Sequence, residues 1–242
     1  MKLQQLCLAV AVAALAVVSS RVVQAEVIIT ELRSKSQTNP EDYFELTNLG
    51  DTPADITGWQ FDDESADIAE AAPLMGISTI APGESVVFFQ LDENDPLSPA
   101  YDPAGEIELF RSFWGGLPGV QVGYQGGAGL GKGDAIVLFD SSDNLIIELA
   151  YGLTTPNETH AGDWAAGNTD GSDTYENQSA VWVPGSDGEF ELAAAGVYGS
   201  FADTSGDFGS PGIVDAAVPE PAACVLAGLA LAGMMAICRR VS

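Results

Sequence analysis

Short apolar runs are the feature of this chain that most constrains its fold. Between residues 26 and 217 these runs are separated by Gly, Pro, Asn and Asp, and no window keeps a helical period. Such runs, bounded by turn-forming residues, are typical of β-strands. Many short strands joined by Gly and Pro turns predict an all-β sandwich rather than an α/β enzyme. The expected strands are Val27–Leu32, Tyr43–Thr47, Ala54–Phe61, Ser85–Leu91, Glu106–Phe110, Ala135–Phe139, Leu145–Tyr151 and Ser179–Val183.

Two of these strands carry an acid among apolar residues. Phe44 and Leu46 share one face of their strand and are predicted to be core, whereas Glu45 shares the other face with Tyr43 and Thr47. Glu31 interrupts the first strand in the same way. An acid in such a position either faces solvent or accepts hydrogen bonds from loop amides, because a buried carboxylate without partners is costly. We expect a structural role for both acids in preference to a catalytic one.

The residues after the second expected strand predict a turn, and a tryptophan farther along the chain is expected to lie at the edge of the core. Asn48, Gly50 and Asp51 combine side-chain turn bonds with tolerance of positive φ, so they are expected to redirect the chain. Trp59 follows Gly58 and is predicted to cover the edge of the core, with its indole N–H needing a partner.

Taken together, these motifs resemble the lamin tail domain. The resemblance spans Val27 to about Asp215 and implies an immunoglobulin-like β-sandwich with a binding or structural role. Its motifs are Ile29-x-Glu31-Leu32, Asp42-x-x-Glu45-Leu46-x-Asn48-x-Gly50, Asp55-Ile56-x-Gly58-Trp59, Ile80-x-Pro82-Gly83, Gly133-Asp134-x-Ile136-x-Leu138-x-Asp140 and Gly209-Ser210-Pro211-Gly212.

A Gly-rich stretch at about residues 93–132 departs from a compact domain of this kind and is interpreted as an insertion. Its aromatic pair, Phe113 and Trp114, is a weak candidate for stacking on sugar rings. The preferred alternative is that both rings pack the insertion onto the sandwich.

The N-terminus predicts a secretory signal peptide over residues 1–25. Lys2 precedes a short apolar stretch and a small-residue stop, which places the signal-peptidase site between Ala25 and Glu26. A retained N-terminal anchor is the alternative.

The C-terminus, residues 218–242, has the form of a sorting signal. The motif Val218, Pro219, Glu220 and Pro221 precedes an apolar transmembrane helix expected at 222–238 and the basic pair Arg239 and Arg240, which stays in the cytoplasm. This arrangement resembles the PEP-CTERM signal of Gram-negative bacteria that make exopolysaccharide. The resemblance implies recognition of the Pro-Glu-Pro motif by exosortase and removal of a transiently inner-membrane-anchored tail. An anchor that is never cut is the alternative.

Charge and cysteine content limit the partners of the predicted mature domain, residues 26–217. It holds 34 of the 35 acids but only Arg33, Lys35, Arg111 and Lys132 among the 8 basic residues, which argues against nucleic acid as a partner. It has no cysteine, so neither a disulfide nor a thiolate metal site is expected there.

A calcium site is only weakly indicated. Asn168, Asp170, Asp173 and Glu176 surround a Gly turn, but their spacing does not fit an EF-hand loop, and a solvated turn is preferred. The acidic turn Asp203–Asp207 is a weaker candidate still. No other cofactor is predicted.

No catalytic set emerges from the sequence. The chain has one histidine, His160, and no G-x-S-x-G elbow, so we expect no enzymatic activity. The sequence predicts an exported protein of the cell surface or extracellular matrix that binds exopolysaccharide or a matrix protein for adhesion or scaffolding. Two alternatives remain: a secreted hydrolase of polysaccharides or phosphodiesters, and a coat protein that self-associates with calcium.

Overall fold

The computed structural model describes part of the chain, namely residues 26–34, 42–91, 95–127, 129–131, 134–151, 178–186 and 188–214. All of them lie in one compact unit, residues 25–216. The predicted signal peptide, sorting signal and calcium loop lie outside the described residues. Within the described ranges, no helix has the length and apolar character needed to cross a membrane.

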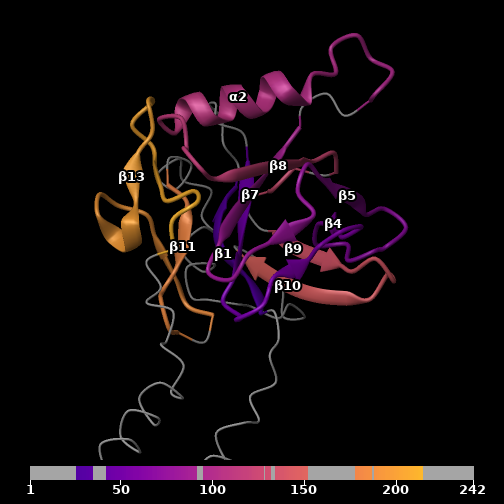
Figure 1. Cartoon of the computed structure of the whole chain (residues 1–242), viewed down its shortest axis with the longest axis horizontal. Coiled ribbons are helices and arrows are strands. Elements are labelled where there is room, and N and C mark those ends of the chain that lie inside the picture. Colours follow the sequence, from indigo (N-terminus) through magenta and orange to yellow (C-terminus); the bar gives the residue numbers. More distant parts are fainter. Residues whose placement is uncertain are drawn as a thin grey trace, which may run out of the picture. The chain divides into compact units, whose positions relative to one another are not determined.

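These residues form mainly β-structure with one α-helix (Figure 1), so the mainly-β prediction is confirmed. A 10-stranded sheet has the order β10-β9-β4-β5-β8-β7-β2-β1-β11-β12, and β3-β6 and β13-β14 form separate pairs. The elements are β1 (Val27–Arg33), β2 (Tyr43–Asn48), β3 (Ala54–Asp55), β4 (Gln60–Asp62), β5 (Ala72–Met75), β6 (Thr79–Ile80), β7 (Ser85–Gln90), α2 (Pro103–Phe113), β8 (Gln121–Gln125), β9 (Asp134–Phe139), β10 (Leu145–Tyr151), β11 (Ala180–Trp182), β12 (Phe190–Leu192), η2 (Val197–Gly199), β13 (Phe201–Ala202) and β14 (Phe208–Gly209).

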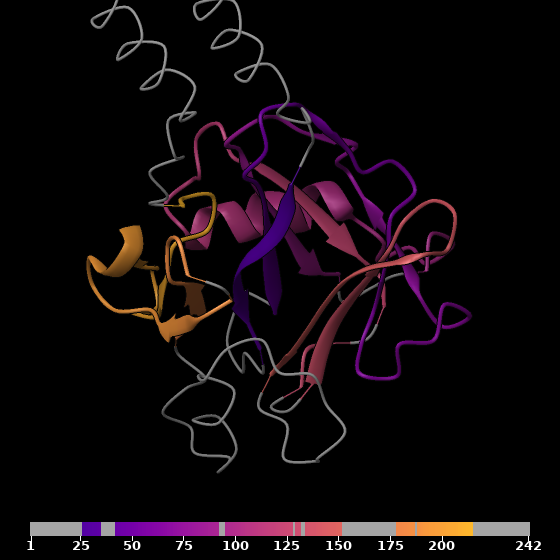
Figure 2. The same ribbon diagram turned by 90° about the horizontal axis from the view of Figure 1, so that it is seen from below.

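The large sheet curls over its own apolar face (Figure 2). Phe44 in β2 stacks on Phe61 in β4 with ring centroids 5.5 Å apart, although three strands separate β2 from β4 in the sheet order. Phe88 in β7 also stacks on Phe44, with ring centroids 5.8 Å apart. The predicted core residues Phe44 and Leu46 are both buried in this interior, which confirms their assignment.

The segment Glu106–Phe110 was expected to be a strand, and that prediction is wrong: it lies inside α2. The Asp102 side chain caps the helix by accepting a hydrogen bond from Gly105 N at 3.0 Å, and Pro103 occupies the first turn. Ile107, Phe110 and Trp114 follow at helical spacing and pack on the same cluster under the helix. The helix lies across β7 and β8 (Figure 1).

The segment Ala54–Phe61, expected to be one strand, is two. β3 pairs with β6, whereas β4 joins the large sheet. The break is at Gly58, whose φ of +77° is a left-handed conformation that favours glycine. Trp59 follows this turn and is only partly buried against the main core, as expected for a ring at the core edge.

The stretch expected as an insertion is not a surface appendage throughout. Its second half supplies β8, which pairs in parallel with β7 and antiparallel with β5. The crossover between β7 and β8 includes α2, and a parallel pair requires such a connection. Gly123 in β8 allows this packing, because a Cβ there would lie 2.4 Å from Met75 O.

Candidate functional site

The second face of β1 and β2 is buried and polar, which the alternating pattern alone did not predict. All six residues of β2 are buried, including Tyr43, Glu45 and Thr47 on the face away from the main core. Aromatic residues of α2 cover one part of this face. Residues 200–214, here called the strap, contact the other part through the hydrogen bonds described below.

Glu31 is the centre of this polar face. It is fully buried, and its Oε1 accepts hydrogen bonds from Tyr43 Oη at 2.6 Å and from Ser179 Oγ. The strap supplies Ser210, whose backbone N–H donates to Oε1 at 2.9 Å and whose Oγ donates to Oε2 at 2.8 Å. Glu31 therefore joins β1, β2, the start of β11 and the strap.

Glu45 makes a second link to the strap. Its Oε1 accepts a hydrogen bond from Thr30 Oγ1 at 2.6 Å, and its Oε2 accepts one from Gly212 N. A hydroxyl chain continues from Thr30 to Thr47 and on to Ser85, each step 2.7 Å. Of the two alternatives for Glu31 and Glu45, hydrogen bonding to loop amides is the one that the structure shows.

Arg33 carries the only buried cationic side chain among the described residues. Its Nη2 donates to Asp207 Oδ2, and its Nη1 lies 3.7 Å from Asp203 Oδ2. Asp203 Oδ1 in turn accepts from Ser205 N at 2.7 Å and from Asp207 N at 2.9 Å. The acidic turn considered for calcium is therefore an ion-pair partner of β1.

Burial raises the pKa of both glutamates on this face. Desolvation is the main cause at each site, and for Glu45 the nearby negative charge of Glu31 adds to it, so the pKa of Glu45 rises from 4.5 to about 8. Hydrogen bonds to the carboxylates act in the opposite direction but do not outweigh desolvation.

The raised pKa values predict a pH dependence of stability. The folded protein retains protons that the unfolded chain releases, so the free energy of unfolding is highest below about pH 4.5. It should fall as pH rises toward 8, by at most about 1.4 kcal/mol per pH unit for each group. Urea unfolding at pH 5, 7 and 9 measures this, and equal stability at pH 5 and 9 would contradict it.

Two glycines of the strap permit close packing, Gly209 against β1 and β2 and Gly212 against Val120, the residue before β8. A Cβ on Gly209 would lie 2.6 Å from Tyr43 Oη and 2.7 Å from both Glu31 Oε1 and Trp114 Cη2. Gly212 has a φ of +80°, and a Cβ there would lie 2.3 Å from Val120 Cγ2. The expected closing motif Gly209-Ser210-Pro211-Gly212 thus has a steric explanation as well as hydrogen-bond donors.

Replacing Gly209 with alanine should destabilise the fold by about 1 to 3 kcal/mol, because the added methyl overlaps three buried groups. Gly206→Ala is the control for backbone strain: the φ of Gly206 is +95°, in the left-handed region that Gly209 does not occupy, and no neighbour lies within 4 Å of its Cβ position. Urea unfolding of both variants separates the steric overlap from backbone strain. A smaller loss for Gly209→Ala than for Gly206→Ala would be inconsistent with this packing.

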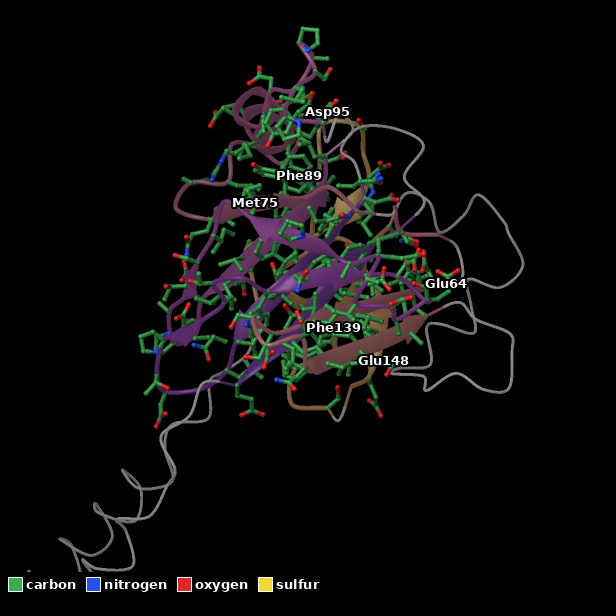
Figure 3. The ribbon with its side chains drawn as sticks, turned by 90° about the vertical axis from the view of Figure 1, so that its right-hand side faces the viewer. Glu64, Met75, Phe89, Asp95, Phe139 and Glu148 are labelled. Atoms are coloured by element: carbon green, nitrogen blue, oxygen red, sulfur yellow. The ribbon has the colours of Figure 1, made fainter. Side chains whose placement is uncertain are left out.

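A separate acidic cluster lies at the edge of the sheet. Carboxylate oxygens of Asp63, Glu64 and Asp134 come within 4.8 Å of one another, and burial raises the pKa of Asp134 to about 7. Asp134 Oδ1 also accepts a hydrogen bond from Ala135 N at 2.8 Å. Figure 3 shows Glu64 at the rim of the molecule, well apart from Phe89 under α2. The cluster was not predicted from the sequence, because Asp134 lies 70 residues after Glu64.

The aromatic pair of the Gly-rich stretch lies at the end of α2. Trp114 is buried, with its ring in edge contact with Tyr43 at 5.9 Å and with Phe201 of the strap at 5.5 Å. Phe113 is partly buried against the same cluster. These positions agree with the packing alternative for Trp114.

The other candidate residues lie outside the described residues: the loop with Asn168, Asp170, Asp173 and Glu176, the single His160, the sorting-signal residues, and Ala25 at the signal-peptidase site. Glu26 is described and exposed, and its N–H donates to Asn48 Oδ1 at 3.2 Å. Asn48 Oδ1 also accepts from Gly50 N at 3.0 Å, as predicted for a turn-forming side chain.

Comparison with known proteins adds one match. The family model described as Lamin Tail Domain matches residues 22–153, which is more than half of the chain. The match ends before β11 and the strap, whereas the resemblance in the motifs was expected to continue to about residue 215. Among curated proteins, the search found no match.

Proposed function

This chain belongs to the lamin tail domain family, and on that premise we propose that it is a non-enzymatic binding or scaffolding protein of the cell surface or extracellular matrix. The family assignment supports a β-sandwich with a binding or structural role. The setting outside the cell rests on the signal-peptide and sorting-signal patterns at the two ends of the sequence.

One observation carries the non-enzymatic part of the proposal. The acids of the two family-like motifs, Glu31 and Glu45, are fully buried and hold the strap through hydrogen bonds. A catalytic carboxylate must reach its substrate, and these two carboxylates are covered by the protein itself. Their arrangement supports a role in stabilising the fold.

The sequence of the C-terminus supports delivery by exosortase in a Gram-negative host. Val218-Pro219-Glu220-Pro221 would be recognised after signal peptidase has cut before Glu26, and the apolar tail would then be removed. Intact-mass spectrometry of the protein from its native host tests this step. Recovery of a chain that still ends at Ser242 would replace sorting and release with permanent anchoring.

The proposed partner is exopolysaccharide or another matrix protein. The strongly acidic mature domain supports solubility at the surface and disfavours anionic partners such as nucleic acid. A pull-down with immobilised residues 26–217 against extracted exopolysaccharide and matrix proteins tests binding. The expected result is retention of one of these partners, whereas failure to retain either would remove the binding role.

An activity screen on polysaccharides and phosphodiesters is the complementary test of the hydrolase alternative. The proposal expects no turnover. Reproducible turnover that persists in a second, independently purified sample would overturn it.

A further inference from the structure

The polar face beneath the strap holds more acid than base. Four buried carboxyl groups, those of Glu31, Glu45, Asp203 and Asp207, lie around one buried guanidinium, that of Arg33. If all four carboxyls were ionised, this part of the interior would carry a surplus of buried negative charge. Isolated buried charges are strongly disfavoured, and a carboxyl group in that situation takes up a proton instead.

The contacts indicate which carboxyl groups hold the proton. Asp203 and Asp207 each contact the guanidinium of Arg33. The hydrogen-bond donors to Glu31 and Glu45 are hydroxyl and amide groups, without a cation among them. Burial therefore favours the protonated forms of the two glutamates.

The groups that face Glu45 come from every element packed around it. β1 contributes Thr30 and the nearby charge of Glu31, β2 contributes Thr47, and β7 contributes no ionisable side chain. Tyr43 donates to Glu31. The strap contributes the N–H of Gly212, whereas its acids Asp203 and Asp207 contact Arg33. Of these neighbours the nearby Glu31 opposes ionisation of Glu45, and its raised pKa agrees with this.

We infer that the C-terminal part of the strap, residues 209–214, is a proton-controlled latch: it closes over β1 and β2 while the glutamate pair holds a proton, and it opens when the pair becomes fully ionised. The strap excludes water from both carboxyl groups, so opening it hydrates them and relieves their repulsion. Closing is therefore coupled to proton uptake. The same coupling makes alkaline conditions favour the open form.

The direction of the pH dependence of strap closure follows from the pKa of Glu45 in the closed and open states. With the strap closed its pKa is about 8, and in water it returns toward the ordinary 4.5. Closure is therefore strongest below about pH 4.5, weakens through neutral pH and is weakest above about pH 8. The curled core on the other face of β2 contains no part of this network, so it stays folded when the strap opens.

Hydrogen–deuterium exchange of the full-length chain between pH 5 and 9 tests the latch. After correction for the chemical exchange rate, exchange of the Ser210 and Gly212 amides should rise by about tenfold per pH unit at most and level off above about pH 8. The amides of Val87 and Phe88, in the central strand β7, should remain protected throughout. Equal exchange of strap and β7 amides at every pH would mean global opening and would overturn the latch.

Glu45→Gln tests whether the pH dependence comes from ionisation of Glu45, because glutamine has nearly the same shape but does not ionise. Glutamine keeps an acceptor for Gly212 N but has no proton to lose, so strap exchange should lose the part of its pH dependence that comes from Glu45 and keep only the part that comes from Glu31. Glu70→Gln, at an exposed position, should keep the wild-type profile. Unchanged pH dependence in Glu45→Gln would overturn the assignment.

Thr30→Val gives a second variant if Glu45→Gln fails to fold. It removes a hydrogen bond that favours the ionised form of Glu45. The pH at which strap exchange levels off should therefore move upward. No movement, or movement toward lower pH, would count against the latch.

Discussion

Replacing Arg33 with alanine is expected to lower the free energy of unfolding by about 3 to 5 kcal/mol. The reason is that Asp203 and Asp207, both buried, would lose the cation between them and remain inside as uncompensated charges. Urea unfolding at pH 7 measures the loss. Because the ion pair joins β1 to the strap, the same variant should also lose strap protection in hydrogen exchange.

Two controls isolate the buried charge as the cause. Glu108→Ala removes an exposed ion pair with Arg111, whose atoms are 3.9 Å apart, and should change stability by no more than about 0.5 kcal/mol. Adding Asp203→Asn and Asp207→Asn to Arg33→Ala removes the uncompensated charges and should recover part of the loss. An Arg33→Ala effect no larger than that of Glu108→Ala would contradict the ion-pair account.

Trp114→Ala should also cost about 3 to 5 kcal/mol, since it empties a large buried volume between α2, β2 and the strap. Trp59→Ala removes a ring that is only partly buried, so its loss should be about half as large or smaller. Thermal and urea unfolding compare the two. A larger loss for Trp59→Ala would reverse the packing roles assigned to these rings.

Trp114→Phe distinguishes packing from sugar binding. The indole Nε1 is buried and makes no hydrogen bond within the described part of the chain. Phenylalanine therefore keeps most of the apolar contact and loses no hydrogen bond. We expect it to recover most of the stability and to leave retention on exopolysaccharide unchanged.

The strands were predictable where local pattern and tertiary environment agree. Five of the expected strands coincide closely with β1, β2, β7, β9 and β10. Each of them is a short run rich in β-branched, aromatic and other apolar residues between turn-forming residues. Helix α2 was missed because a five-residue window at Glu106–Phe110 also fits a strand. The signal that would have identified it is Asp102-Pro103, an N-cap followed by a first-turn proline.

Only the acceptor groups of the candidate site were predictable; the residues that donate to them were not. Sequence alone indicated that Glu31 and Glu45 need hydrogen-bond donors, but Ser210 and Gly212 lie 179 and 167 residues away from them. Periodicity is a local signal, so it cannot report which loop covers a strand face. Arg33 is one of only four basic residues in residues 26–217, and a rare basic residue in a strand weakly indicates an ion pair. Its two acidic partners could not be identified from the sequence, because they lie in a turn that resembled a solvated one.

The position of the strap also sets an order of events during biosynthesis. β1 is made first, yet the partners of its buried side chains are made last: Asp207 follows Arg33 by 174 residues. Contacts this distant in sequence form slowly and cannot form before nearly the whole domain has left the ribosome. Until then Glu31 and Arg33 remain hydrated and charged on the nascent chain. The charged side chains that the folded domain buries therefore keep β1 soluble until the strap has been synthesised.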